Sequence, residues 1–305
     1  MKISVREKSI KIIATGFLTA WMLLLASAIN GQLIYVANDS AGTVGKYTTS
    51  GTTINATLIS GLNFPQGLAI IEDDLYVASS FGNRIGVYTT SGATINPSLI
   101  TGINFPAALA VLGNNLLVTG PYSTVSEYTA SGTLINSSLI SGLHSPLGIA
   151  VEGDNIFVLD GGTRTVGEYT ASGAVINAAL ISGLNVPVGI AVSGNNIFVA
   201  NDGDGTVGEY TTAGATINAS LISGLESPNC LAVYGNNLFV AGGLGQDYIS
   251  EYTTDGTLVV PHLLYVGGPE GMIIVPVPEP TPWRLIILSL ALFVLPTLKK
   301  SFFLI

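Results

Sequence analysis

The chain has 305 residues, of which 48% are apolar and only 10% are charged, with 19 acidic against 10 basic side chains. This composition is too rich in apolar residues for a disordered chain. The excess of acidic residues argues against nucleic acid as a partner, because binding to phosphates needs a basic surface. Cys230 is the single cysteine, so no intrachain disulfide is expected, and we expect it to be a buried apolar side chain.

The first 28 residues have the pattern of a secretory signal peptide. Four basic residues lie within residues 1–11, an apolar stretch covers residues 12–25, and the small residues Ala26-Ser27-Ala28 follow. A basic start, a short apolar run and a small-residue site are typical of a segment that signal peptidase removes. We therefore expect residues 1–28 to be a signal peptide. The alternative is an N-terminal membrane anchor, for which the apolar run is short.

Residues 29–276 form six copies of a repeat, in which equivalent prolines are 40 or 41 positions apart. Each copy contains four short runs that favour β-strands, separated by turn residues; in one copy these runs are residues 189–192, 197–200, 206–212 and 216–222. Nothing in the unit has the length or the period of a helix. Four strands in about 40 residues are typical of a propeller blade. The markers of the repeat are Pro65, Pro106, Pro146, Pro187, Pro228 and Pro269, together with Tyr47, Tyr88, Tyr128, Tyr169, Tyr210 and Tyr252.

The two ends of this repeat region complement each other. The first strand, Leu33–Ala37, matches the second strand of a repeat, and the last strand, Gly271–Val275, matches the first. We therefore predict an all-β, six-bladed β-propeller with four antiparallel strands per blade, closed by the C-terminal strand completing the N-terminal blade. Such closure removes free sheet edges. An open solenoid is the alternative, but it would not need this split of one blade between the two ends.

The second blade contains the segments Phe64-Pro65-Gln66-Gly67-Leu68-Ala69-Ile70, Leu75-Tyr76-Val77-Ala78 and Gly82-Asn83-Arg84-Ile85-Gly86-Val87-Tyr88. In these segments, which carry the resemblance best, the repeat resembles the NHL repeat. The resemblance implies a propeller, and some members of the family bind RNA. Here residues 29–280 carry 18 acidic and 3 basic side chains, so we expect no binding to nucleic acid.

The C-terminal segment, residues 277–305, contains the motif Pro278, Glu279 and Pro280, followed by Trp283, an apolar run over residues 285–298 and two lysines. In these features it resembles the PEP-CTERM sorting signal of bacterial exosortase substrates. The resemblance implies export in a Gram-negative bacterium, membrane attachment before processing by an exosortase-type protease, and a final place in the envelope, on the outer surface or in the exopolysaccharide matrix. Two features depart from the family, since the end is not rich in arginine and Pro296 interrupts the run. The alternative is an uncleaved C-terminal anchor.

Ligands of propellers usually bind to the face formed by the loops between the second and third strands and the loops between blades. Asn and Asp are also the commonest turn residues, so their presence in these loops has a structural explanation as well. The candidates for a ligand face are Asn38, Asp39, Asn83, His144, Asp160, Asn201, Asp202 and Glu226. Further polar residues expected in the same loops are Asn63, Asn104, Asn185, Asp204, Asp247 and Glu270.

The sequence contains no nucleophile–base constellation and no glycine-rich phosphate loop. The near-identical repeats show no odd residue cluster, and Glu127, Glu168, Glu209 and Glu251 are expected to be solvated repeat positions. We therefore favour a non-enzymatic, exported module that binds protein or polysaccharide, without a cofactor. The alternative is an enzyme, because lactonase-type propellers hold a metal with Glu, Asn and Asp, and streptogramin-lyase-like propellers use a catalytic histidine, for which His144 would be the candidate.

Overall fold

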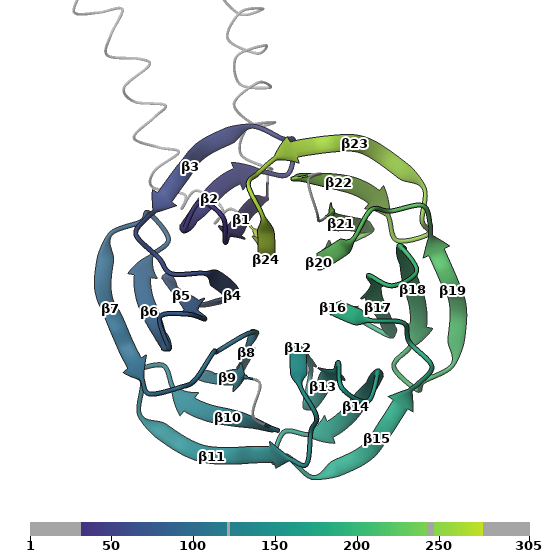
Figure 1. Ribbon diagram of the computed structural model, residues 1–305, viewed down its shortest axis with the longest axis horizontal. Helices are drawn as coiled ribbons and strands as arrows, with labels where there is room; N and C mark the ends of the chain where they lie inside the picture. Colours follow the sequence, from purple (N-terminus) through teal and green to yellow (C-terminus); the bar gives the residue numbers. More distant parts are fainter. Residues whose placement is uncertain (1–31, 121–122, 243–246, 277–305) are drawn as a thin grey trace, which may run out of the picture. The chain divides into compact units, whose positions relative to one another are not determined.

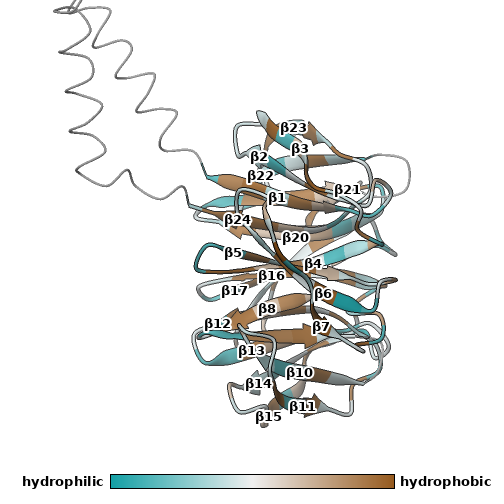
Figure 2. Cartoon of the chain, turned by 90° about the vertical axis from the view of Figure 1, so that its left-hand side faces the viewer, coloured by the Kyte–Doolittle hydropathy of each residue, from teal (hydrophilic) through white to brown (hydrophobic). Residues whose placement is uncertain are grey.

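The computed structural model describes residues 32–120, 123–242 and 247–276. These residues form six four-stranded antiparallel sheets arranged as a ring of blades, which confirms the predicted six-bladed β-propeller (Figure 1). Figure 2 views the ring from its edge, and much of the strand surface is hydrophobic. The predicted signal peptide and the sorting motif at Pro278, Glu279 and Pro280 lie outside the described residues. Within the described part, no helix is long and apolar enough to span a membrane.

Each blade runs from an innermost strand at the centre of the ring to an outermost strand at its rim (Figure 1). Blades 1 to 3 consist, in this order, of β24 (Pro269–Val275), β1 (Leu33–Asn38), β2 (Thr43–Thr48) and β3 (Thr53–Ile59); β4 (Pro65–Ile71), β5 (Asp74–Ser79), β6 (Arg84–Thr89) and β7 (Thr94–Thr101); and β8 (Leu109–Leu112), β9 (Asn115–Thr119), β10 (Thr124–Thr129) and β11 (Leu134–Ser141). Blades 4 to 6 consist of β12 (Pro146–Glu152), β13 (Asn155–Asp160), β14 (Thr165–Thr170) and β15 (Val175–Ile181); β16 (Pro187–Ser193), β17 (Asn196–Asn201), β18 (Thr206–Thr211) and β19 (Thr216–Ile222); and β20 (Pro228–Tyr234), β21 (Asn237–Gly242), β22 (Tyr248–Thr253) and β23 (Leu258–Tyr265).

Blade 1 closes the ring in the way that the sequence predicts. Strand β24 pairs antiparallel with β1, with Leu33 opposite Val275 and Ala37 opposite Gly271. The other five blades are each continuous in the chain. The N-terminal and C-terminal ends of the propeller therefore stand where every other blade has the hairpin between its first and second strands.

The glycine two positions after the repeat proline allows the innermost strands to come close together. The Gly67 amide donates to the carbonyl oxygen of Ala107 (2.7 Å), which joins β4 to the segment just before β8 across the blade boundary. A Cβ atom at Gly67, Gly189 or Gly271 would overlap a backbone carbonyl of the next blade. This close approach is a physical reason for glycine in the Pro-x-Gly pattern, since any side chain there would push neighbouring blades apart.

The core lies between the faces of neighbouring blades. The side chain at the centre of each second strand is fully buried, as at Phe157, Phe198 and Phe239, and one apolar cluster joins Phe198 of blade 5 to Leu238 of blade 6. Strands covered on both faces explain why the second strands are continuous apolar runs. In blades 1 and 2 this central position is Tyr35 or Tyr76, and each hydroxyl donates to a carbonyl of the following blade.

Three of the four repeated glutamates of the third strands are buried, so the prediction that they are solvated is wrong for these three, while Glu127 is half-buried. Glu168, Glu209 and Glu251 are only 8–9% exposed, because the neighbouring blade covers this face of the sheet. The Asn155 amide donates to the Glu168 carboxylate (2.9 Å), and the Asn196 amide donates to the Glu209 carboxylate (2.8 Å). Burial raises the pKa values of Glu209 and Glu251.

The outermost strands are irregular edges. The first five residues of β3, β7, β11, β15 and β19 are exposed, and the pairing of each of these strands shifts register near its asparagine. In β15, for example, the Asn177 Oδ1 accepts a hydrogen bond from the Ala179 amide (3.1 Å), a local turn within the strand. Bulged edges of this kind resist pairing with another chain.

Candidate functional site

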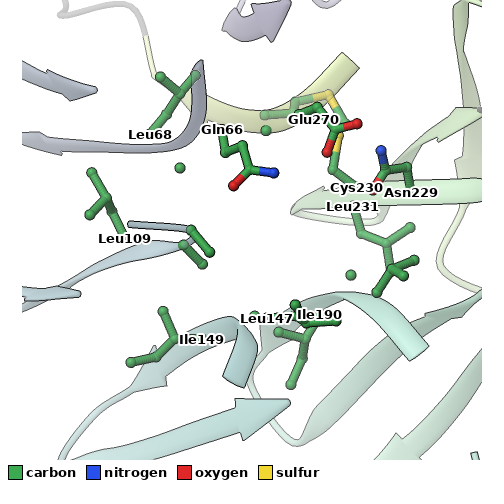
Figure 3. Close-up of a pocket in the computed structure, with 18 of the residues that line it drawn as sticks. Gln66, Leu68, Leu109, Leu147, Ile149, Ile190, Asn229, Cys230, Leu231 and Glu270 are labelled. Atoms are coloured by element: carbon green, nitrogen blue, oxygen red, sulfur yellow. The ribbon is translucent and has the colours of Figure 1, made fainter. Parts of the chain in front are cut away.

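The centre of the ring contains a cavity of about 290 Å³, lined by the innermost strands of all six blades (Figure 3). One side chain from each blade enters it at the position after the repeat proline. In five blades the proline is the first residue of the innermost strand, so equivalent positions meet around the cavity. These six side chains are Gln66, Ala107, Leu147, Val188, Asn229 and Glu270.

Three of these side chains are polar, and they come from consecutive blades. Asn229 of blade 6, Glu270 of blade 1 and Gln66 of blade 2 lie together on one side of the cavity (Figure 3). Both amides lie beside the Glu270 carboxyl group. Burial raises the pKa of Glu270, the nearby Asp39 raises it further, and the polar side chains of Asn229 and Gln66 oppose this rise. The Asn229 amide also donates to the carbonyl of Pro269 (3.4 Å).

The opposite side of the cavity is apolar. Leu109, Leu147, Ile149 and Ile190 line it, and Figure 3 shows these side chains across the opening from Gln66 and Glu270. Cys230 also lines the cavity; it is buried as predicted, and burial raises the pKa of its thiol. The central cavity is therefore divided into a polar half and an apolar half.

A second cavity, of about 470 Å³, shares Val188, Asn229 and Glu270 with the first. It lies on the loop face, which we define as the face formed by the loops between second and third strands and the loops that join successive blades. Asp39, Asp202 and Asp247 line it together with Glu270. No Lys, Arg or His of the described ranges lines either cavity, so the shared mouth is an acidic opening.

Of the predicted ligand-face residues, Asp39 and Asp202 both line this mouth. Asn38 and Asn201, which precede them, are only 3% exposed at the ends of their strands. The Asn38 amide donates to Thr43 Oγ1 (3.4 Å). Glu226 is exposed in a neighbouring loop and lines neither cavity.

His144 and Asn83 lie in loops of the same face and Asp160 ends β13 there, but none of the three lines the two cavities. The buried Asp160 accepts hydrogen bonds from the backbone amides of His144 (2.8 Å) and Gly162 (3.1 Å), so it holds two loops together. The His144 imidazole lies 3.8 Å from Asp160 and its side chain is 69% exposed. Asn83 Oδ1 accepts from the Phe105 amide (3.0 Å). These residues shape loops rather than the cavities.

Three phenylalanines, two of them exposed, form a cluster on the loop face, which residue-type reasoning did not predict. The rings of Phe64 and Phe81 are stacked with centroids 4.4 Å apart, and Phe105 meets Phe81 edge to face at 5.9 Å. Phe81 is 55% exposed and Phe105 is 43% exposed. The expectation that the repeats contain no odd residue cluster is therefore wrong. We call Phe64, Phe81 and Phe105 the phenylalanine cluster.

The sequence analysis also missed Gln66 and Asn229. Their signal was present, since the position after the repeat proline is polar in three copies and apolar in the other three. That variation produces a polar group only because the six positions meet around one cavity and the three polar copies are adjacent there.

The polar half of the cavity does not fit a metal cage. Glu270 is its one carboxylate, and its partners there are amides. Over residues 32–120, 123–242 and 247–276, no three His, Cys, Asp or Glu side chains gather closely enough to hold a metal ion. A divalent cation prefers several oxygen ligands, among them carboxylates, so these residues give little support to metal-assisted lactone hydrolysis.

No known family model matches the chain, and no curated protein does. Solved propellers are similar in fold. A chain of a nidogen/laminin complex has a TM-score of 0.68 at 14% identity, with 81% of this chain and 99% of that chain covered. Virginiamycin B lyase from Staphylococcus aureus has a TM-score of 0.55 at 20% identity, covering 69% of this chain and 73% of the lyase. A protein of unknown function from Bacteroides caccae has a TM-score of 0.62 at 15% identity, with 80% of this chain and 99% of that protein covered. At these identities the similarity establishes the propeller fold alone.

Proposed function

We propose that the protein is an exported binding module that takes its ligand, protein or polysaccharide, at the central mouth of the loop face. The observation that carries this proposal is the break in repeat symmetry, since Gln66, Glu270 and Asn229 gather on one side of an otherwise apolar cavity. Repeats placed only for stability would not need a different residue here in each blade. A few polar groups converging in an apolar recess are typical of ligand sites.

The ends of the propeller support display at a surface. Leu33 and Val275 pair at the side of blade 1 that faces away from the loop face. A tether through either end would therefore attach to the side of the ring opposite the mouth. The basic and apolar pattern of residues 1–28 and the Pro278-Glu279-Pro280 motif support export and envelope sorting, by signal peptidase and an exosortase-type protease, in a Gram-negative bacterium.

A lyase-like activity is the second candidate. Glu270 favours it, because a carboxyl group whose pKa is raised in a cavity can act as a general acid or base. A related fold also occurs in virginiamycin B lyase. His144, the candidate catalytic histidine, weakens this reading because its side chain points into neither cavity.

Two experiments test the proposed function. Mass spectrometry of the protein from envelope and secreted fractions should find a chain that starts near residue 29 and ends near Glu279; a chain starting at Met1 in the cytoplasmic fraction would refute export. Turnover of lactones or cyclic peptides by the purified protein, abolished in Glu270→Gln, would replace the binding module by an enzyme. Binding of an envelope polysaccharide or protein without turnover, weakened by Glu270→Gln, is the result we expect.

A further inference from the structure

The loop face is divided into two chemically different halves. The phenylalanine cluster lies in the loops of blades 2 and 3, on the side of Gln66. On the other side, the loops of blades 5, 6 and 1 carry five carboxylates, Glu270 adds a sixth from the start of β24, and none of these loops contains Lys, Arg or His. We call these six the acidic arc: Asp39, Asp202, Asp204, Glu226, Asp247 and Glu270.

The phenylalanine cluster is held in place by the loops around it. The Ser80 amide donates to the carbonyl of Phe64 (2.9 Å), and the Phe105 amide donates to Asn83 Oδ1 (3.0 Å). These bonds attach both inter-blade loops to the loop that carries Phe81. The rings are therefore ordered before any partner arrives, which lowers the entropic cost of binding.

The cluster belongs to one place in the ring and not to the repeat. At the position of Phe81, blades 1, 4 and 5 have Ser40, Gly162 and Gly203, whereas the sequence has Tyr122 in blade 3 and Leu244 in blade 6. Before the repeat proline, blades 4, 5, 6 and 1 have Ser145, Val186, Ser227 and Gly268. Blades 1, 4 and 5 are therefore built without an aromatic side chain at either position. Exposing phenylalanines costs solubility and gains nothing for the core, so an exposed cluster of this kind is typical of an interaction site.

We propose that the loop face docks a protein segment in which an aliphatic or aromatic side chain is flanked by Lys or Arg. The apolar side chain would contact the phenylalanine cluster, while the basic groups would reach the acidic arc across the mouth. This inference rests on the proposed function and names its partner. Charge complementarity selects the partner, because ammonium and guanidinium groups supply the donors that the arc's carboxylates accept.

A protein fits this surface better than a neutral polysaccharide. The rings of the cluster cover one another, with Phe81 stacked on Phe64 and its edge against Phe105, and phenylalanine has no group that hydrogen-bonds a sugar hydroxyl. An apolar side chain needs only the exposed ring surface. Aromatic anchors with charged neighbours are typical of protein interfaces.

The test uses the full-length chain and a fluorescent synthetic peptide that has one Trp between several Lys residues. Fluorescence anisotropy should show binding that weakens with added salt. Two control peptides carry Glu in place of Lys or Ala in place of Trp, and both should bind more weakly. We expect Phe81→Ser to lower the affinity for the Lys–Trp peptide by about tenfold. The double change Asp202→Asn with Asp247→Asn should reduce the salt dependence of this affinity.

Ile217→Ser is the matched control for Phe81→Ser. Ile217 is 50% exposed on the outermost strand β19, so its loss removes a similar exposed apolar group from another surface. Unchanged peptide affinity in this variant, with unchanged unfolding temperatures for all variants, would support the proposal. Equal weakening in both variants, or no binding of the Lys–Trp peptide, would overturn it.

Titration with a neutral oligosaccharide, maltohexaose, distinguishes the other class of partner. Binding of this sugar that depends on Phe81, without binding of the peptide, would overturn the protein partner while leaving the binding module in place. Turnover or cytoplasmic retention would refute the proposed function separately, because the peptide measurement depends on neither.

Discussion

Leu33 and Val275 lie opposite each other in the antiparallel pairing of β1 with β24, although they come from the two ends of the propeller. This pairing completes blade 1 and makes the ring continuous. A break here would free an edge on β1 and remove the innermost strand of one blade, so the stability of the whole ring depends on it.

A disulfide at this pair should stabilise the protein. Facing residues of antiparallel strands have a Cα separation that a disulfide can span. The free energy of unfolding of the oxidised Leu33→Cys/Val275→Cys protein should be about 2 to 4 kcal/mol higher than that of its reduced form, because the bond constrains the unfolded chain. Denaturant unfolding of the two forms measures this, and Cys230 can remain because it is buried. Equal stabilities would show that the closure seen between β1 and β24 is wrong.

Gly271→Ala should destabilise the ring strongly. The added Cβ atom would overlap the carbonyl oxygen of Gln66 in the next blade, so the strands around the central cavity would have to separate. We expect a loss of at least about 2 kcal/mol and a disturbed Gln66–Glu270 contact. Gly267→Ala is the control, since a Cβ there meets no atom within 4 Å. Similar unfolding temperatures for the two variants would contradict the close packing of the blades.

Two tyrosine hydroxyls that join blades should differ in importance. The Tyr76 hydroxyl donates to the carbonyl of Ala130 (2.9 Å). The carbonyl of Thr90 accepts two hydrogen bonds, from the Tyr35 hydroxyl (3.0 Å) and from the Lys46 ammonium (3.0 Å). Tyr76→Phe should therefore cost about 1 kcal/mol, and Tyr35→Phe should cost less because Lys46 remains. Chemical denaturation compares them. A larger loss in Tyr35→Phe would mean that Lys46 does not compensate.

The raised pKa of Glu270 predicts a pH dependence of stability. The folded state binds the proton of the Glu270 carboxyl group more tightly than the unfolded state does, so this proton stabilises the folded state at low pH. It is lost as the pH rises from the ordinary value of 4.5 through the raised value. Glu270→Gln should remove this part of the pH dependence and unfold at a higher temperature than the wild type at neutral pH.

Thermal unfolding across this pH range tests the effect, with the exposed Glu226→Gln as control. Asp39→Asn should lower the pKa of Glu270, because it removes a negative charge that raises it. A carboxyl NMR titration would measure the shift directly. An unchanged pKa in Asp39→Asn would contradict the position of Asp39 beside the cavity mouth.

The repeat itself carries enough information to predict the fold. Four apolar runs per copy need burial on two faces, and only stacked blades supply it, so the prolines and tyrosines of the repeat were sufficient to predict six blades. The matching ends, Leu33–Ala37 and Gly271–Val275, predicted the closure for the same reason, since an unpaired inner strand would expose its backbone. The loop residues Asp39 and Asp202 could also be assigned to one face from their place in the repeat.

What the tertiary structure alone decided is which copies of a repeat position become neighbours and what covers them. Gln66, Asn229 and Glu270 are distant in sequence and form one polar group only because the ring places blades 6, 1 and 2 side by side. The sequence predicts solvated glutamates in the third strands, yet the adjacent blade buries Glu168, Glu209 and Glu251. Local sequence determines strands and turns, but burial and charge pairing depend on contacts between blades, which ring closure sets.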